Sequence, residues 1–345
     1  MPSIRQIAAA CGFSKSTVAA ALRNKGVIAQ STRKLVHATA AKMGYRTDAR
    51  MNELMSHLRQ GRPSQAVCNL AWLNTGATPS DWTNRNYTKV YLEGARRRAE
   101  QLGYSLGVIW MGDPQLTLPQ LTRQLKSRGI RGLVLPLPLK CPLLHAFDWQ
   151  NYATVALGEN NPELTFNRVV PHYLRNMIIA CEAIHALGYR RPALLIDEYA
   201  DWESGNAFSS AFVRFQHKIA GGVAIPIPAD MDDTKNTVAW VKKYGPDIVI
   251  GHTHQLYDEL IAAGFRIPED LAYVHLHLGP DTPGWAGIDP GQADLGAATI
   301  EAVVALLHRN QIGLPSRPKE IALLGQWRDG WTAPVARHSK GSAGA

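Results

Sequence analysis

The sequence has no long hydrophobic run and few cysteines, which argues against two broad classes of protein. No segment reaches about 18 consecutive apolar residues, the length that a membrane-spanning helix needs. Polar Ser3, Arg5 and Gln6 stand where the apolar part of a signal peptide would begin. The four cysteines are widely separated and form no Cys-x-x-Cys pair, which indicates reduced thiols rather than a disulfide framework or a zinc module. We therefore expect a cytoplasmic protein with no membrane partner.

The chain also lacks the short motifs of common catalytic sites. It contains no Gly-x-Ser-x-Gly, no His-Glu-x-x-His and no phosphate-binding P-loop. Asp197 and Glu198 are adjacent carboxyl groups at the end of an expected strand, but adjacent strand residues point to opposite faces of a sheet. The sequence therefore predicts a protein that is not an enzyme and that needs no cofactor.

Net positive charge is confined to the start of the chain. The 345 residues carry a formal net charge of +9, and the first 62 hold seven arginines and four lysines against only Asp48 and Glu53. The other residues hold 26 basic and 26 acidic side chains. An apolar content of 46% and a charged content of 19% are typical of globular proteins, and the length suits two or three domains. A basic first segment on a neutral body predicts a polyanionic partner.

The first 45 residues have the pattern of a helix-turn-helix unit. Gly12 separates two short helical stretches and can adopt the positive φ that favours the end of a helix. Ser14 can cap the second helix, which such a unit places in the major groove of DNA. Ser31 can cap a third helix that ends at Gly44. The expected inner faces are Ile4, Ile7, Ala8 and Cys11, then Val18, Ala21 and Leu22, then Val36, Thr39 or Ala40, and Met43.

These residues resemble the headpiece of the lac repressor family of transcription regulators. The resemblance rests on Ile7-Ala8, Cys11 to Val18, Ser31-Thr32-Arg33 and Met43-Gly44-Tyr45. It implies that the helix beginning near Ser14 reads DNA, and that an amphipathic hinge helix over residues 51–58 inserts Leu54 into the minor groove. The expected DNA-binding residues are Arg5, Ser14, Lys15, Ser16, Thr17, Ala20, Arg23, Asn24, Arg33 and Leu54.

The expected DNA contacts differ in kind. Lys15 and Ser16 stand at the family's base-reading positions. The candidate phosphate contacts are Arg5, Thr17 and Arg33. The chain has Ala19-Ala20 where the family usually has Ser-Arg, so a candidate for two-pronged contact with guanine is missing, although Ala20 can touch a thymine methyl. The family's operator preference therefore does not carry over to this chain.

From residue 67 onward, strand-like apolar runs alternate with helical stretches. Strands are expected at 67–73, 105–110, 132–137, 153–157, 192–196, 247–251 and 271–275, and helices at 90–103, 118–128, 174–187, 206–216, 255–263 and 291–309. This alternation predicts an α/β fold of parallel sheets with helices on both faces. Ligands of such folds bind beyond the carboxyl ends of the strands.

The body resembles the effector-binding core of the same family, which is like a periplasmic sugar-binding protein. Segments such as Glu93-Gly94-Ala95, Leu187-Gly188-Tyr189 and Gly264-Phe265-Arg266 carry the resemblance. It implies a two-lobed core with dimerisation surfaces. The expected domains are a headpiece at 1–46, a hinge helix and linker at 47–64, a core at 65–332 with one lobe at about 65–160 and 287–325 and the other at 161–286, and a disordered tail at 333–345.

The cleft between the lobes is the expected effector site, and its residues depart from those of the family. Histidines and aromatic residues replace most of the acidic and arginine side chains that hold a sugar in the family. The candidate effector-binding residues are Trp82, Tyr87, Trp110, His172, Tyr173, Asn206, His252, His254 and His277. Three interpretations stay open: a different effector such as a sugar or sugar acid, a cleft with no small-molecule role, or a metal bound by His252-x-His254 and His275-x-His277.

The residues and the resemblance together predict a homodimeric transcription regulator, with repression as the expected mode, in the bacterial cytoplasm and at the nucleoid. Two headpieces would read the two halves of a palindromic double-stranded DNA operator. A sugar-like small molecule would act through the cleft. The alternatives are a DNA-binding regulator with no small-molecule effector and a solute-binding module with no role at DNA.

Overall fold

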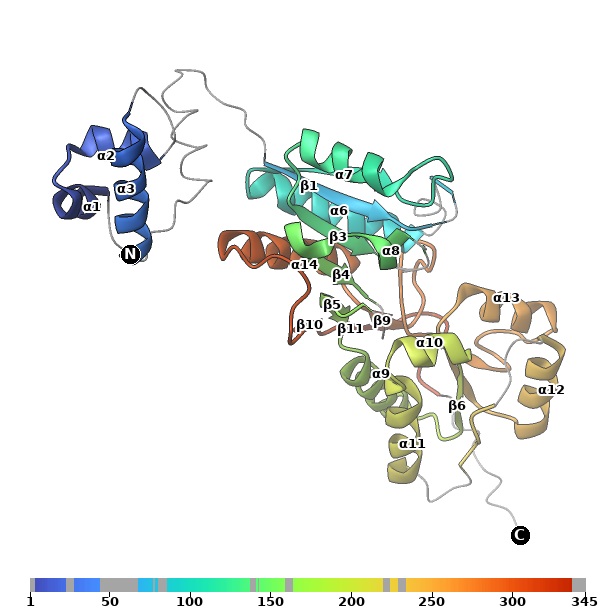
Figure 1. The fold of residues 1–345 in the computed structure, drawn as a ribbon. Helices are drawn as coiled ribbons and strands as arrows, with labels where there is room; N and C mark the ends of the chain where they lie inside the picture. The colour runs from blue at the N-terminus through green and yellow to red at the C-terminus, as the bar shows by residue number, and fades with distance from the viewer. Residues whose placement is uncertain are drawn as a thin grey trace, which may run out of the picture. The chain divides into compact units, whose positions relative to one another are not determined.

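The computed structural model describes residues 4–22, 28–43, 68–76, 78–79, 86–136, 141, 143–158, 164–219, 224–228 and 234–336. The chain divides into two compact units, Met1–Ala66 and Val67–Ala345 (Figure 1). Among the helices of the described residues, none has the length and apolar character that crossing a membrane requires.

Three short helices lie in the described part of the first unit. They are α1 (Ile4–Cys11), α2 (Lys15–Leu22) and α3 (Gln30–Lys42). Gly12 follows α1 with a φ of +70°. Glycine adopts this conformation at little cost because it has no Cβ atom. The Ser14 hydroxyl accepts a hydrogen bond from the Thr17 amide at 3.1 Å, which confirms the predicted cap of α2. The predicted cap at Ser31 is wrong, because α3 already begins at Gln30 and places Ser31 inside the helix.

The inner faces of these helices meet in a small apolar core. The buried members are Ile7, Ala8, Val18, Ala21, Val36 and Ala40, and Cys11, Phe13, Leu22, Ile28 and Met43 pack around them. The predicted inner faces are confirmed, except that the side chain of Ile4 lies outside the described residues. Ala40 is 4% exposed, which resolves the choice between it and Thr39. A core of this size supplies little stability of its own.

The second unit contains two lobes, and the first is built on a parallel sheet. The described strands run in the order β10-β5-β4-β3-β1-β2. They are β1 (Cys68–Asn74), β2 (Tyr104–Trp110), β3 (Gly132–Pro136), β4 (Ala153–Leu157), β5 (Asn167–Pro171) and β10 (Glu320–Leu323). Helices α6 (Asn86–Gln101) and α14 (Gln292–His308) pack on one face, and α7 (Leu118–Ser127), α8 (Leu143–Ala146) and the short 3-10 helix η1 (Trp149–Asn151) pack on the other (Figure 1).

Helices α6 and α14 cross with their backbones in close contact. A Cβ atom added at Gly94 would overlap the backbone of Ala293, and one added at Gly296 would overlap the backbone of Tyr91. Glycine is needed at both positions, since a larger residue would push the helices apart. The crossing thereby holds the backbone of Tyr91 at a defined place on the sheet.

The second lobe is built on another sheet, whose described strands run in the order β11-β9-β8-β7-β6. They are β6 (Pro192–Leu195), β7 (Ile248–Gly251), β8 (Ala272–His275), β9 (Gly287–Asp289) and β11 (Gln326–Arg328), of which β11 alone among these described strands is antiparallel to its neighbour. Helices α9 (Tyr173–Ala186), α10 (Glu198–Glu203) and α11 (Ala207–Ile219) pack on one face, and α12 (Thr234–Tyr244) and α13 (His254–Ala262) pack on the other.

The predicted α/β class is confirmed, and each predicted strand and helix of the body is present with its ends shifted by a few residues. The sequence did not predict β5, β9, β10, β11 or α12. These strands have three to five residues, too few for a clear apolar alternation.

The chain passes between the lobes at other points than the sequence predicts. Residues 167–171 form β5 of the first sheet, although they fall in the expected second lobe at 161–286. Residues 287–289 form β9 of the second sheet, although they fall in the expected first-lobe segment 287–325. The short strands at each passage pair with the edge of the sheet that the chain is leaving, and this pairing leaves no mark in the local sequence.

Part of the predicted tail is ordered. Ala333 is 3% exposed in the core of the second lobe, and the carbonyl of Pro334 accepts a hydrogen bond from the Tyr189 hydroxyl at 2.7 Å. The disordered tail predicted at 333–345 therefore begins no earlier than residue 337, because 333–336 pack against the lobe. Residues 337–345 and the hinge and linker predicted at 47–64 lie outside the described residues.

Candidate nucleic-acid interface and ligand pocket

The exposed side of α2 carries polar side chains at its N-terminal end. Lys15 and Ser16 are exposed, while the opposite side of the helix is buried in the three-helix core. The Ser14 hydroxyl lies 2.7 Å from the Ser16 hydroxyl and 2.8 Å from the Thr17 hydroxyl. These contacts gather three hydroxyl groups beside a lysine at a helix N-terminus, where free amide groups and the helix dipole favour an anion.

The surroundings of α2 are strongly positive. The sequence has no acidic residue before Asp48, and the described helices carry Arg5, Lys15, Arg33, Lys34 and Lys42. Arg5 is exposed on α1, and Ala20 is half-buried on α2. Of the predicted DNA-binding residues, Arg23, Asn24 and Leu54 lie outside the described residues. The described ones present cations and hydroxyls without a nearby carboxylate, a surface suited to phosphates and base edges.

The second unit contains a pocket of about 750 Å³ between its two lobes. The first lobe contributes one side of α6 and the carboxyl ends of β3, β4 and β5, and the second lobe contributes the segments that follow β6, β7 and β8. Its lining residues are Thr88, Tyr91, Pro136, Leu157, Gly158, Pro171, Tyr173, Asp197, Tyr199, Ala200, Glu203, His252, Thr253, His254, Gln255, His275, His277 and Asp281. The pocket thus lies at the strand ends where the α/β fold predicts a ligand site.

Four predicted effector residues meet in this pocket, namely Tyr173, His252, His254 and His277. Three others lie elsewhere. Trp110 ends β2, where its indole N–H donates to the carbonyl of Gly76 at 2.8 Å. His172 precedes α9 and accepts a hydrogen bond from the Arg175 amide at 3.5 Å, and Asn206 is exposed in the turn before α11 with a φ of +59°.

Two further predicted residues cannot be placed in the pocket from the described part of the chain. Trp82 lies outside the described residues, as does the side chain of Tyr87, although the backbone of Tyr87 belongs to α6. The roles of the nine predicted effector residues therefore stay predictions.

Most of the other polar residues that line the pocket were not predicted from the sequence. Tyr91 comes from a helix that the sequence marks only as amphipathic, and Glu203 comes from the short helix α10. Asp197 had a usable signal, since it directly follows the strand predicted at 192–196, and its side chain caps α10 by accepting from the Ala200 amide at 2.7 Å. The sequence analysis considered it only as a catalytic carboxylate and not as a ligand contact at a strand end.

His277 stands at the centre of a contact between the lobes. Its Nε2 lies 3.5 Å from the hydroxyl of Tyr91 on α6, at the long limit of a hydrogen bond. Its ring packs edge-on against His252, with 5.9 Å between the ring centroids. Burial lowers the pKa of His277 to about 3, and the neighbouring His252 adds to this shift. The ring is therefore neutral at pH 7.

His275 presents an unused donor. Its Nδ1 accepts a hydrogen bond from the His277 amide at 3.1 Å, so the neutral ring carries its proton on Nε2. The residue is 5% exposed, and its Nε2 has no hydrogen-bond partner among the described residues. Burial, followed by the nearby histidines, holds the pKa of His275 well below its usual value. Burial also lowers the pKa of His252, which Asp197 partly opposes.

The predicted metal pairs do not form a regular strand arrangement. His252 follows β7 and His254 begins α13, so these residues are not on one strand face. The His254 ring stacks on Trp285 with 4.9 Å between centroids, and its Nδ1 lies 3.1 Å from the Asp258 carboxylate. Within the described part of the chain, no three histidine, cysteine or acidic side chains come together in a metal-binding arrangement.

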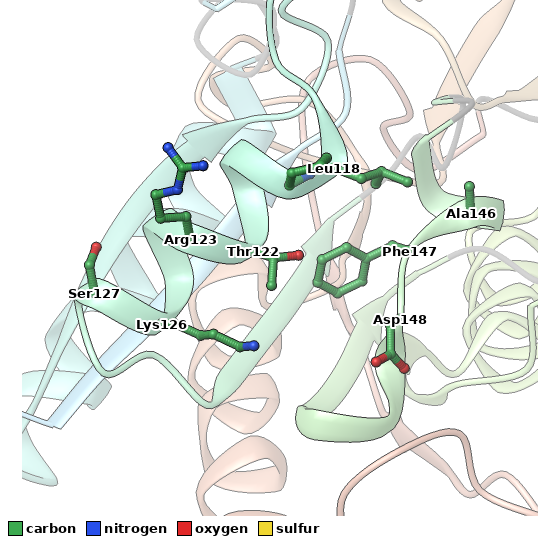
Figure 2. A pocket seen from close by; sticks show the side chains of 9 residues that line it. Leu118, Thr122, Arg123, Lys126, Ser127, Ala146, Phe147 and Asp148 are labelled. Atoms are coloured by element: carbon green, nitrogen blue, oxygen red, sulfur yellow. The ribbon is translucent and has the colours of Figure 1, made fainter.

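A second depression, of about 760 Å³, lies on the outer side of the first lobe. It runs between α7 and the segment 146–148, and Figure 2 shows Thr122 facing the ring of Phe147 across it. Arg123 and Lys126 extend from α7, and Asp148 lies beneath Phe147 in this view. The groove is an open surface feature with few converging polar groups, unlike the pocket between the lobes.

The headpiece matches a known family profile. Residues 3–48 match the profile described as "Bacterial regulatory proteins, lacI family". No curated protein sequence matches the chain.

Solved structures with the same fold cover from 78% to 96% of the chain. The transcriptional regulator CelR in complex with cellobiose is 16% identical, with 96% of this chain and 100% of that chain covered and a TM-score of 0.58. The lac repressor dimer bound to operator and the anti-inducer ONPF is 16% identical, with 96% and 99% covered and a TM-score of 0.55. A LacI family regulator from Enterococcus faecium with bound ribose is 15% identical, with 78% and 100% covered and a TM-score of 0.56.

These likenesses establish the fold, in which a helix-turn-helix headpiece precedes a two-lobed core. The profile match covers the residues from which the headpiece pattern was inferred, and the structural matches extend over the core. The headpiece sequence therefore matches the lacI family of bacterial regulatory proteins, and the chain as a whole has the fold of the CelR and lac repressor structures.

Proposed function

We propose that this protein is a homodimeric transcription repressor that binds a palindromic DNA operator through α2 and responds to a small molecule in the pocket between its lobes. The observation that carries the DNA-binding part is the acid-free, basic headpiece, with Lys15 and three hydroxyls exposed at the start of α2. Because DNA carries dense negative charge, such a surface attracts it, while the few side chains that reach base edges select the sequence.

The shape of the core supports the effector part. Structural neighbours hold cellobiose, ONPF or ribose, and this chain has a pocket of about 750 Å³ at the carboxyl ends of its strands. A ligand that touches both lobes changes the free energy of lobe closure, and the lobes are joined to the headpieces of a dimer. Effector binding therefore alters the affinity of the dimer for its operator.

The DNA-binding proposal is tested with an operator selected from a random duplex pool by the full-length protein. We expect the affinity to fall steeply as salt rises, because each neutralised phosphate releases counterions. Lys15→Ala lowers the affinity for the selected operator by tenfold or more, the size of a lost base contact. Lys242→Ala removes an exposed lysine of α12 and leaves the affinity unchanged. Salt-independent binding, or no enrichment of any duplex, would contradict the proposal.

Dimerisation and effector control are tested separately. Sedimentation of the free protein is expected to give a mass twice that of the 37.9 kDa chain. A thermal-shift screen of neutral sugars, sugar acids and amines identifies ligands, and each hit is then added to the operator complex. A ligand that stabilises the protein yet leaves operator affinity unchanged would remove the regulatory role of the pocket without touching the role in DNA binding.

A further inference from the structure

The charged side chains that line the pocket between the lobes are unfavourable for an acidic ligand. Its described lining residues include three carboxylates, Asp197, Glu203 and Asp281, and neither lysine nor arginine occurs among them. All three carboxylates belong to the second lobe. An anionic ligand would meet uncompensated negative charge there, and the cost of burying it would be large. The inference that follows rests on the proposed function, in which this pocket holds an effector.

The histidines of the wall do not restore positive charge. His275 is buried and His252 and His277 are half-buried, and this burial lowers the pKa of each of them. His254 is paired with the carboxylate of Asp258 rather than directed at a ligand alone. At neutral pH, the buried imidazoles of the pocket are therefore neutral hydrogen-bonding groups, and the carboxylates are its formal charges.

The remaining polar groups indicate what else the ligand carries. His275 lines the pocket and is 5% exposed, and its Nε2–H donor has no protein acceptor in the described part of the chain, so a ligand oxygen at this place would satisfy it. Three tyrosines, Tyr91, Tyr173 and Tyr199, add ring faces and hydroxyls to the wall. Glu203 is near enough to Tyr173 to raise the pKa of that phenol, after burial itself. A carboxylate beside aromatic rings is a favourable site for a cation.

We propose that the effector is a hydroxylated organic cation, a small molecule with a protonated amine that faces Asp197 and Glu203 and with oxygen atoms that accept from His275. The amine makes charge-assisted hydrogen bonds to the carboxylates of α10, and the tyrosine rings surround its apolar body. The aliphatic and proline side of the first lobe, which includes Pro136, Leu157 and Pro171, covers the less polar face of the ligand.

The test compares matched compounds that differ in charge. Glucosamine, glucose and glucuronate form one set, and tyramine, tyrosol and 4-hydroxyphenylacetate form another. Binding to the full-length protein is measured by calorimetry and thermal shift at pH 7. We expect the amine of at least one set to bind tenfold or more tightly than its uncharged analogue, and the acid of that set to bind most weakly, as charge-assisted hydrogen bonds require.

Substitutions of the pocket carboxylates test whether they cause the preference for an amine. Asp197→Asn keeps the cap of α10, because asparagine caps as well as aspartate, and together with Glu203→Gln it removes the two carboxylates of this segment that line the pocket. The double variant is expected to lose the preference for the amine by tenfold or more while operator binding stays intact, which shows that the protein is folded. Glu269→Gln removes an exposed carboxylate outside the pocket and should leave the preference unchanged.

Two results would overturn the ligand class in different ways. If glucose, tyrosol or an acid binds as tightly as its amine, the pocket holds an effector of another class and the proposed function stands. If no compound of either set binds, the cationic class falls, whereas the effector role of the pocket is judged by the wider thermal-shift screen and operator binding by its own salt dependence.

Discussion

The headpiece and the pocket arrange polar groups in opposite ways. The headpiece displays lysines, arginines and hydroxyls on the outside of a small core, with no acidic residue before Asp48. The pocket gathers imidazoles and carboxylates between the two lobes of the second unit, with neither lysine nor arginine among its described lining residues. Exposed charge acts at a distance and is weakened by salt, whereas buried groups act through contact. The first surface therefore attracts any polyanion before a few side chains choose the sequence, and the second selects by direct fit.

The prediction with the largest expected effect is a substitution that unfolds the headpiece and leaves the second unit folded. Val18→Asp places a carboxylate at a fully buried position of the three-helix core, and we expect this to cost several kcal/mol, enough to unfold the headpiece. Operator affinity should fall more than a hundredfold, while the main calorimetric transition of the second unit stays in place. Val213→Asp, at a residue that is 43% exposed on α11, is the matched control and should leave both properties unchanged. Joint loss of both transitions would show that the regions do not fold independently.

A change of pH tests the burial of the imidazoles. The unfolded chain takes up protons on histidine near pH 6.5, whereas burial lowers the pKa of His277 in the folded chain to about 3. The free energy of unfolding therefore falls as the pH drops below about 6.5, by up to about 1.4 kcal/mol per pH unit for each such histidine.

His277→Gln removes one of these contributions. Its unfolding free energy should decline less steeply than that of the natural protein between about pH 6 and pH 4, as measured by denaturant unfolding at each pH. His217→Gln, at an exposed position of α11, keeps the natural slope. Equal slopes for all three proteins would mean that the His277 ring is open to water in solution.

The smallest effect concerns the contact between the lobes. Tyr91→Phe removes a hydroxyl that lies 3.5 Å from the His277 ring, and we expect a loss below about 1 kcal/mol because the contact is long. Tyr104→Phe removes a similar tyrosine contact, 3.2 Å from His308, within the first lobe. Small-angle scattering should show a wider distribution of lobe separations for Tyr91→Phe than for Tyr104→Phe. Identical distributions would assign no closing role to the contact of Tyr91 with His277.

The fold was predicted better than the site, and particular residues show why. The headpiece could be predicted because its core forms between helices a few residues apart, so the spacing of Ile7, Val18 and Val36 carries the information. The alternation of strands and helices in the body is equally local. The short strands β5, β9, β10 and β11 were missed because their pairing depends on a distant sheet edge rather than on their own composition.

The side chains that line the pocket were also only partly predictable from the sequence. His252 and His277 were predicted because the resemblance places them at ligand-contact positions near strand ends, but the same reasoning chose Trp110 at the end of β2, which lies outside the pocket. Tyr91 lines the pocket on α6, whose position depends on the close approach of α14 at Gly296. This contact joins residues about two hundred positions apart in the sequence. No spacing rule connects such residues.

The sequence by itself determined the separation of a basic headpiece from a neutral α/β body, because charge, helix spacing and strand alternation are properties of neighbouring residues. Only the tertiary structure decided which polar groups share the pocket and how they ionise. The neutrality of His277 and the free donor of His275 follow from burial and from contacts between neighbouring strand ends, which form only in the folded chain.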